Sequence, residues 1–400
     1  REDLDAHERF MERLEADGRL DRKVEGLPPP EKIRELKEQG LGLTRPEIAV
    51  LISYAKITLF DALVASSVPD DSHFRDTLIT YFPEQLAQHA EAMDGHRLKR
   101  EIIATRLAND MVNLGGPTFV SRALESTGAD AGAIARAFEA GRTMFRFKDY
   151  TDQINALDNQ VPAEVQNRLH DEVIRLLRRQ TYWLARRGRG GADMAIDDVI
   201  ARYQPGVDQL KALVADFASP FDAEGVETRA RLYMEGGAPE DLSRAVARLR
   251  PLTSSSDVID LAGEHDWPLP AAAWLYHAVG ARFGFDRLRG AGGQLSSTLH
   301  WDRLAMRRLI EDLYASQQTL TAAMMGYAGQ AGGALASGVE DPGRDWAEGL
   351  VESWTSANAD EVDRADRALD EVAAAGSWTL SKVAISTTQL RELAASARGA

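Results

Sequence analysis

Residues 44–64 read TRPEIAVLISYAKITLFDALV, and this stretch decides the fold class. Its apolar residues recur every three or four positions, the spacing of one helix face: Ile48, Leu51, Ile52, Ala55, Leu59 and Leu63. Thr44 and Glu47 form a capping box, in which the two side chains satisfy free backbone N–H groups at the helix start. Pro46 falls in the first turn, where its missing N–H costs nothing. The stretch therefore predicts a buried helix that starts at Thr44–Glu47.

The same periodicity extends along the chain. Two further helix faces are Val165, Leu169, Val173, Leu176, Leu177 and Leu184, and then Ile196, Val199, Ile200, Tyr203, Val207, Leu210, Leu213 and Phe217. We expect Pro205 to kink or break the second of these helices, and Gly128 to end an earlier one. No sustained alternation of apolar and polar residues is present, and no Asn-Gly or Asp-Gly turn joins β-branched runs. The sequence predicts an all-α array of about fifteen or more helices without a substantial sheet.

Helix breakers divide the 400 residues into three expected blocks. Residues 1–43 contain Pro28-Pro29-Pro30 and resemble a lead-in from an upstream domain. Residues 44–190 form a first helical block, which ends in an Arg- and Gly-rich stretch at 186–191 that we expect to be a flexible turn. Residues 192–400 form a second helical block, richer in Ala and Gly. No fixed-period repeat is visible, which argues against a solenoid.

Composition excludes several classes of protein. The chain has no Cys, so it has no disulfides, no thiolate nucleophile and no sulfur-ligated zinc. No apolar run approaches the roughly 20 residues of a membrane-spanning helix, and no signal peptide is visible. These features favour the cytoplasm. Since the sequence begins at Arg1 rather than Met, we expect a segment of a longer or processed polypeptide.

Acidic residues outnumber basic ones, 62 to 47, for a formal net charge of −15. This charge disfavours general binding to nucleic acid or to anionic membranes. The excess is concentrated at residues 339–372, where eleven Asp and Glu face three Arg. The role of this acidic stretch does not follow from the sequence.

No catalytic, cofactor-binding or metal-binding residue is predicted. No two of the eight His have the i, i+3 or i, i+4 spacing of a helical metal site. We interpret Asp3/His7 and His73/Asp76 as surface ion pairs. No Gly-Lys dipeptide of a phosphate-binding loop and no Gly-x-Ser-x-Gly elbow is present. The sequence at 290–293, Gly-Ala-Gly-Gly, is the nearest approach to a dinucleotide loop, but no strand precedes it, so a helix–helix linker is the better interpretation.

A basic stretch offers an alternative function. Seven Arg accompany Tyr182 and Trp183, opposed only by Asp171 and Glu172: Arg168, Arg175, Arg178, Arg179, Arg186, Arg187 and Arg189. A basic helix with aromatic residues can bind phosphates or stack on bases. The favoured interpretation is that Trp183 lies on the apolar face and that the Arg residues pair with acidic groups of this protein. The remaining aromatics are expected to be core or interface anchors: Trp267, Trp274, Tyr276, Trp301, Trp346, Trp354 and Trp378.

The first half of the chain resembles the large NAD-specific glutamate dehydrogenases of bacteria. The resemblance covers about residues 10–185. It rests on Gly18-Arg19-Leu20-Asp21-Arg22, Glu25-Gly26-Leu27-Pro28, the stretch from Leu43 to Leu51 with Tyr54-Ala55-Lys56, Tyr81-Phe82-Pro83, the stretch from His96 to Thr105, Asn109, Val112-Asn113, Gly115, Phe119 and Thr127-Gly128-Ala129. Beyond residue 185 no sharp motif is recognisable.

The resemblance implies a parent enzyme that oxidatively deaminates L-glutamate to 2-oxoglutarate and ammonia with NAD as hydride acceptor. The family's glutamate-binding lysines and its NAD-binding Rossmann unit precede the region that matches residues 44–47, so no catalytic or cofactor residue is carried over. The resemblance implies a C-terminal helical region with a structural, oligomerisation or regulatory role, whose partners are its own catalytic domain and other subunits. The alternative is an effector-binding module that recognises an anionic ligand through Arg168–Arg189. A third possibility, a free-standing helical enzyme, is not supported by any group of candidate catalytic residues in the sequence.

The basic residues at 97, 99 and 100 precede a helix whose Leu98, Ile102 and Met111 are expected to point inward. A helix start normally favours acidic residues because of its dipole. Basic residues there indicate a contact with an acidic partner surface.

Overall fold

Helix initiation follows the sequence signals closely at the start of α3 (Arg45–Val64). In the computed structural model, which describes residues 4–187, 195–295, 300–330 and 343–397, the Thr44 hydroxyl accepts a hydrogen bond from the Glu47 backbone N–H. The Glu47 carboxylate accepts one from the Thr44 backbone N–H at 2.6 Å. The predicted capping box is therefore confirmed. The buried face consists of Leu51, Ala55, Leu59 and Leu63.

The described residues form helices and connecting turns, with no strand among them. The all-α prediction is confirmed. The chain separates into two compact units: unit 1 comprises Arg1–Asp149 and Val173–Arg202, and unit 2 comprises Tyr150–Glu172 and Tyr203–Ala400. The divisions fall inside three helices, α9 (Phe147–Asn155), α10 (Ala163–Arg187) and α11 (Ile196–Phe217). The division into a lead-in at 1–43 and helical blocks at 44–190 and 192–400 stays a prediction.

Unit 1 is built around the packing of α3 on α6 (Lys99–Gly115). Its other helices are α1 (Leu4–Ala16), α2 (Pro30–Glu38), α4 (Arg75–Ile79), α5 (Ala90–Asp94), α7 (Phe119–Thr127) and α8 (Ala131–Met144), with the 3₁₀ turns η1 (Val68–Asp70), η2 (Ser72–Phe74) and η3 (Glu84–His89). As predicted, α7 ends at Gly128, which adopts a left-handed conformation with φ of 63°.

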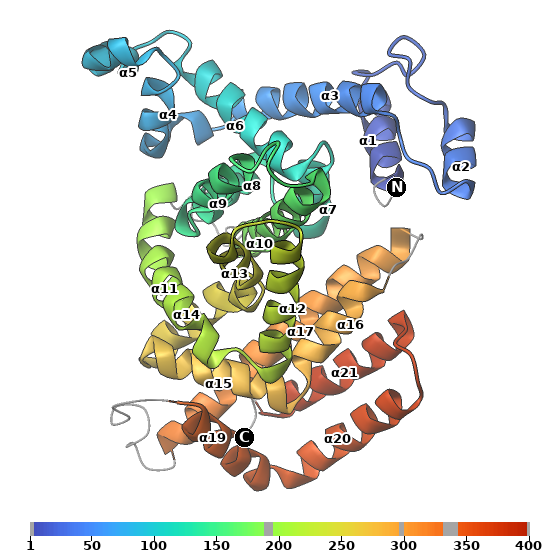
Figure 1. Cartoon of the computed structure of the whole chain (residues 1–400), viewed down its shortest axis with the longest axis vertical. Coiled ribbons are helices and arrows are strands. Elements are labelled where there is room, and N and C mark those ends of the chain that lie inside the picture. The colour runs from blue at the N-terminus through green and yellow to red at the C-terminus, as the bar shows by residue number, and fades with distance from the viewer. Residues whose placement is uncertain (1–3, 188–194, 296–299, 331–342, 398–400) are drawn as a thin grey trace. The chain divides into compact units, whose positions relative to one another are not determined.

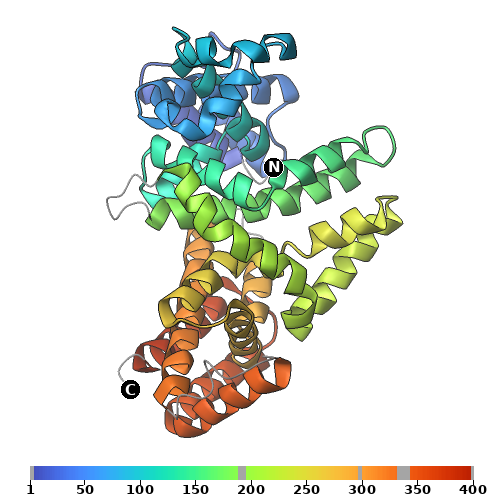
Figure 2. The ribbon, with the colours of Figure 1, turned by 90° about the vertical axis from the view of Figure 1, so that its left-hand side faces the viewer.

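Unit 2 is dominated by the long helix α17 (His300–Gln330), which packs along α21 (Leu380–Ala397), as Figure 1 shows. α12 (Pro220–Glu235) and α13 (Glu240–Ala247) form a hairpin, visible in yellow-green in Figure 2. The other elements are η5 (Pro251–Ser254), α14 (Ser255–His265), α15 (Leu269–Arg282), α16 (Phe285–Gln294), α19 (Arg344–Ala357) and α20 (Ala359–Ala374). Among the helices of the described ranges, none has the length and apolar character needed to cross a membrane.

Three local predictions are corrected. α11 continues through Pro205, so the predicted break is wrong, because packing of its buried face outweighs the one backbone hydrogen bond that proline removes. The other predicted outcome, a kink at Pro205, stays a prediction. The glycines at 290–293 lie within α16 and not in a linker, and a Cβ on Gly290 would lie 2.7 Å from Cζ of Phe221, so close packing explains that glycine. Arg186 and Arg187 belong to the last turn of α10, and residues 188–191 of the predicted turn lie outside the described residues.

Candidate functional site

His73 of unit 1 has different partners from the one that the sequence indicated. Its Nδ1 lies 2.7 Å from Oδ1 of Asp197, and its Nε2 lies 3.4 Å from Oε1 of Glu139. The predicted His73/Asp76 pair is therefore wrong, because η2 directs the imidazole toward α8 and the start of α11. The other predicted pair contains Asp3, which lies outside the described residues.

Local structure fixes the position of His73. The Asp71 carboxylate accepts a hydrogen bond from the His73 backbone N–H at 3.1 Å, which caps the short turn η2. The next residue, Phe74, is fully buried and meets the imidazole edge to face at 5.4 Å between ring centroids. The cap and the buried ring together hold the imidazole in one orientation.

Glu139 lies at the centre of the site. It belongs to α8, which is capped by Asp130, whose carboxylate accepts a hydrogen bond from the Ala133 backbone N–H at 2.8 Å. α8 is buried on most of its surface, and Glu139 is only 4% exposed. A carboxylate at such a position requires charged partners, because removing an unpaired ion from water costs on the order of several kcal/mol.

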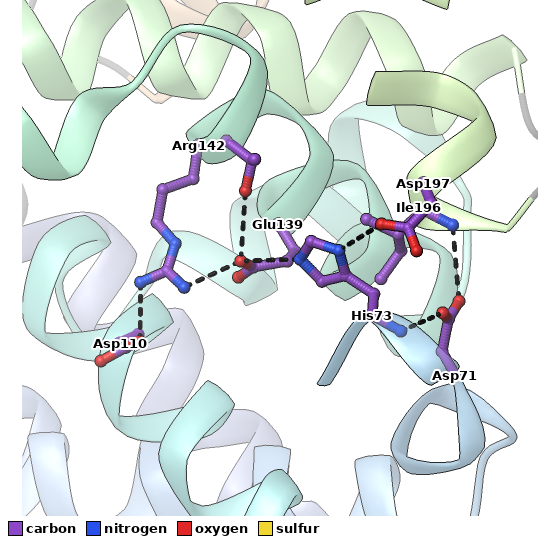
Figure 3. Close-up of polar contacts among 8 residues, drawn as sticks. Asp71, His73, Asp110, Glu139, Arg142, Ile196 and Asp197 are labelled. Carbon is purple, nitrogen blue, oxygen red and sulfur yellow. Dashed lines mark hydrogen bonds and ion pairs between the residues drawn. The ribbon is translucent and has the colours of Figure 1, made fainter. Parts of the chain in front are cut away.

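Arg142 provides the principal charge partner of Glu139 (Figure 3). Its Nη2 donates to Oε1 of Glu139 at 2.8 Å, and its Nη1 donates to Oδ2 of Asp110 on α6 at 2.7 Å. The Thr143 hydroxyl lies 3.4 Å from the same Glu139 oxygen. The guanidinium thus bridges α8 and α6.

Asp71 connects this site to the start of α11. Its carboxylate, 5% exposed, accepts hydrogen bonds from Nη1 of Arg136 at 2.6 Å and from the backbone N–H of Ile196 at 3.4 Å. Ile196 is the first residue of α11, where backbone N–H groups lack partners within the helix and the dipole favours negative charge. A side chain 125 residues away in the sequence therefore caps this helix.

The electrostatics of the site favour full ionisation. Burial alone would lower the pKa of His73, but its hydrogen bonds to Glu139 and Asp197 and their charges outweigh burial and raise that pKa above its usual value. Burial opposes ionisation of Glu139, but the His73 hydrogen bond and the Arg142 charge hold the Glu139 pKa below its usual range. Burial likewise opposes the charge of Arg142, whose pKa is nevertheless raised by Glu139 and Asp110.

The arrangement can hold charges and position helices. We refer to Asp71, His73, Asp110, Glu139, Arg142 and Asp197 as the ionic network. Each cation in it contacts two carboxylates. Its four carboxylates outnumber its two cations, and Arg136 supplies a further positive charge at Asp71. Within the described ranges, no group of three or more His, Asp and Glu side chains has the geometry to hold a metal ion.

The basic stretch of α10 offers no exposed aromatic platform in its described part. Tyr182 and Trp183 are 6% and 7% exposed, and the Arg187 guanidinium lies over the Trp183 ring at 4.1 Å. Glu172 forms a bidentate ion pair with Arg250, with both N···O distances at 2.8 Å. Stacking of bases on these two rings is therefore disfavoured. Recognition of an anion through Arg168–Arg189 stays a prediction. Arg189 lies outside the described residues.

One of the basic residues at the start of α6, Arg100, has its acceptors within unit 1. Arg100 pairs with Asp70 and donates to the backbone carbonyls of Val64 and Ser66 at 2.8 and 2.7 Å, at the end of α3. The acidic group that Arg100 contacts thus lies inside this chain, and a contact of Arg97 or Lys99 with an acidic partner surface stays a prediction. Ile102 and Met111 are buried as expected, whereas Leu98 is 54% exposed because α6 begins only at Lys99.

The predicted aromatic anchors of unit 2 divide into three groups by exposure. Trp267, Tyr276 and Trp354 are buried, which confirms them as core residues. Trp274, Trp346 and Trp378 are half-buried. Trp301 is 74% exposed and belongs to no core, so an interface role for it stays a prediction.

Comparison with known proteins identifies the family. The family described as "Glutamate dehydrogenase, C-terminal" matches residues 40–392. This chain belongs to that family. It is 34% identical to an NAD-specific glutamate dehydrogenase of Halomonas elongata over 99% of this chain, and 34% identical to one of Pseudomonas aeruginosa over 100% of it. An NAD-specific glutamate dehydrogenase of Mycobacterium tuberculosis is 29% identical over 98% of this chain.

The match also extends the resemblance beyond its motifs. The sequence motifs of glutamate dehydrogenase ended near residue 185, whereas the family match continues to residue 392 and so includes most of unit 2. The chain spans about a quarter of the length of these curated relatives, 24%, 24% and 23% respectively.

Proposed function

We propose that this glutamate dehydrogenase C-terminal chain is a non-catalytic helical region of an NAD-dependent enzyme. The parent converts L-glutamate and NAD to 2-oxoglutarate, ammonia and NADH. The chemistry and the NAD site lie in another part of that polypeptide, and this region gives structural, oligomerisation or regulatory support.

The ionic network is the observation that carries the proposal. A catalytic acid or base needs a protonation state that changes near the working pH and a free path to substrate. Here the ionic network commits His73 to two carboxylates and Arg142 to two carboxylates. Those contacts join η2, α6, α8 and the start of α11, so they serve the arrangement of helices.

The proposed partners are the catalytic part of the parent and further copies of the chain. Several large apolar side chains support this part of the proposal, since they are exposed on well-defined helices or turns: Ile57 at 53%, Tyr81 at 50%, Leu98 at 54% and Trp301 at 74%. Tyr81 and Leu98 also belong to motifs that carry the family resemblance. Apolar groups of this size in solvent are suited to covering by another protein surface.

An assay of the purified 400-residue chain tests the proposal. NADH formation is followed by absorbance with saturating L-glutamate and NAD, with the Pseudomonas aeruginosa enzyme as positive control and circular dichroism to verify the helical fold. We expect no glutamate-dependent NADH formation. Turnover that scales with the concentration of the folded chain would refute the non-catalytic assignment. Size-exclusion chromatography with light scattering on the same sample measures self-association.

A further inference from the structure

Unit 2 contains a hollow that the proposed function does not use. Its volume is about 630 Å³, within the range of roughly 300–1,000 Å³ that is usual for small-molecule sites. Residues of four helices line it: α14, α17, α19 and α21. Because α17 packs against each of the other three helices, the walls belong to one packed part of unit 2. A hollow of this size can therefore hold a small organic molecule.

Small side chains of α17 leave this space open. Leu320 and Met324 of this helix are fully buried in the core, whereas Ala322, Ala323 and Gly326 line the hollow. A Cβ on Gly326 would have no neighbour within 4 Å. The hollow thus exists because these three positions on one helix face carry no bulky side chain.

Apolar and aromatic groups complete the walls. Leu261 of α14 and Trp354 of α19 line the hollow and are only 1% and 4% exposed, so both side chains are anchored in the core. Tyr327 of α17 also lines it, and its hydroxyl lies 3.1 Å from Oγ of Ser353. Aromatic rings offer apolar contact, and their π-electron faces attract cations. These walls suit a ligand with an apolar or aromatic body.

Three polar side chains of the lining retain hydrogen-bonding capacity. Within the described part of the chain, the Glu264 carboxylate and the Gln318 amide form no hydrogen bond or ion pair with another residue. The side-chain amide of Asn358 donates to the Trp354 carbonyl at 2.8 Å, which leaves its Oδ1 as an acceptor. Oxygen acceptors therefore outnumber N–H donors among these three groups.

The charges around the hollow are negative. Glu264 is the one charged side chain among its described lining residues. The lining also includes residues from the last turns of α14, which ends at His265, and of α21, which ends at Ala397. Carbonyl groups at the end of a helix carry partial negative charge. The end of α19 adds less, because α20 begins directly after it with the opposite dipole. The hollow therefore favours a cation over an anion.

We propose that the hollow lined by α14, α17, α19 and α21 binds a small organic cation, an ammonium ion with an apolar or aromatic body. The ammonium group donates hydrogen bonds to the Glu264 carboxylate and to the amide oxygens of Gln318 and Asn358. The body of the ligand lies against the apolar walls. This charge preference is opposite to that expected of the α10 stretch Arg168–Arg189, and the site does not depend on the proposed function of the chain.

Isothermal titration calorimetry on the full 400-residue chain, at pH 7 and constant ionic strength, tests the site. The probe is phenethylammonium chloride, which joins a positive charge to an aromatic body. Phenethyl alcohol and hydrocinnamate are titrated in parallel. Because they attach a neutral and a negative group to the same aromatic body, they measure the contribution of the positive charge.

Two variants with matched controls locate the binding. Glu264→Gln removes the charge but keeps the shape of the side chain, and Glu352→Gln is its control, because Glu352 is exposed on α19 and lies outside the lining. Gly326→Leu fills the hollow. Its control is Gly329→Leu, because Gly329 lies one turn later on α17, is also exposed with open space around a Cβ, and lies outside the lining.

We expect saturable binding of phenethylammonium to the wild type and to both controls. Gly326→Leu should weaken this binding by at least about tenfold, because the leucine side chain occupies the space of the ligand. Glu264→Gln should weaken it by at least about threefold, since this carboxylate is exposed and its ion pair is worth less than a buried one. The alcohol and the carboxylate should bind the wild type more weakly than the ammonium by at least about the same factor.

The absence of saturable phenethylammonium binding to the wild type would overturn the proposal. So would equal or tighter binding of phenethyl alcohol or hydrocinnamate. Unchanged affinity in Gly326→Leu or Glu264→Gln, with the helical fold verified by circular dichroism, would also overturn it, as would an equal loss in the matched controls.

Discussion

Replacing Glu139 by Gln removes the central carboxylate of the ionic network while it preserves the shape of the side chain. His73 and Arg142 would each lose one of two anionic partners. Breaking a buried ion pair costs about 3–5 kcal/mol. We expect about 3 kcal/mol, at the lower end of that range, because Asp110 and Asp197 remain and are themselves 42% and 62% exposed.

Urea unfolding at pH 7 measures this change, and hydrogen exchange of peptides from α8 and η2 localises it to unit 1. A loss of 3 kcal/mol corresponds to a decrease of about 6–12 °C in the melting temperature of a unit of this size. Glu12→Gln is the control, because Glu12 is an exposed residue of α1 in the same unit. The reasoning is refuted if Glu139→Gln loses no more than about 0.5 kcal/mol, the usual range for surface substitutions.

Three further predictions concern other positions. His73→Gln should destabilise the chain most below about pH 6.5, the usual pKa of His. Because the pKa of His73 is raised in the folded chain, the difference in stability between wild type and variant should decrease as the pH rises through the folded-state pKa. A difference in urea midpoints that does not change with pH would contradict this prediction. Thr44→Ala should cost about 1 kcal/mol in urea unfolding through loss of the capping box, and a change below 0.3 kcal/mol, roughly, would contradict that role. Gly263→Ala should raise the melting temperature, because nothing lies within 4 Å of the added Cβ and alanine favours the helix by about 1 kcal/mol. Gly236→Ala should lower the melting temperature, because the added Cβ would clash with Val165. The opposite order of melting temperatures would contradict the packing at both sites.

Much of the fold could be predicted because its determinants are local. Helix faces repeat every 3.6 residues, so Leu51, Leu59 and Leu63 could be assigned to one buried face from their spacing alone. The capping box spans four residues, and the stop at Gly128 depends on one left-handed residue. The continuity of α11 through Pro205 could not be predicted, because tertiary packing decides it.

The ionic network lay beyond sequence reasoning for a different reason. His73 contacts residues 66 and 124 positions away, and no spacing rule covers such separations. One signal was available: Glu139 follows Phe138 in a run whose neighbouring positions are apolar, and Arg142 lies three residues later on the same helix. A charged pair within an apolar helix indicates a buried ion pair, but the identity of its other partners needs the structure.

The physical cost of the ionic network indicates what it contributes. Buried ion pairs add little net stability compared with well-packed apolar residues, although removal of one member costs several kcal/mol, about 3–5. We infer that their gain is in specificity, because a shift of one of the helices would separate charges that are now paired. In unit 1 the ionic network brings η2, α6, α8 and the start of α11 together, and the Asp71 carboxylate both holds Arg136 and caps Ile196. The contacts of the ionic network thus fix the positions of η2, α6, α8 and the start of α11 relative to one another within unit 1.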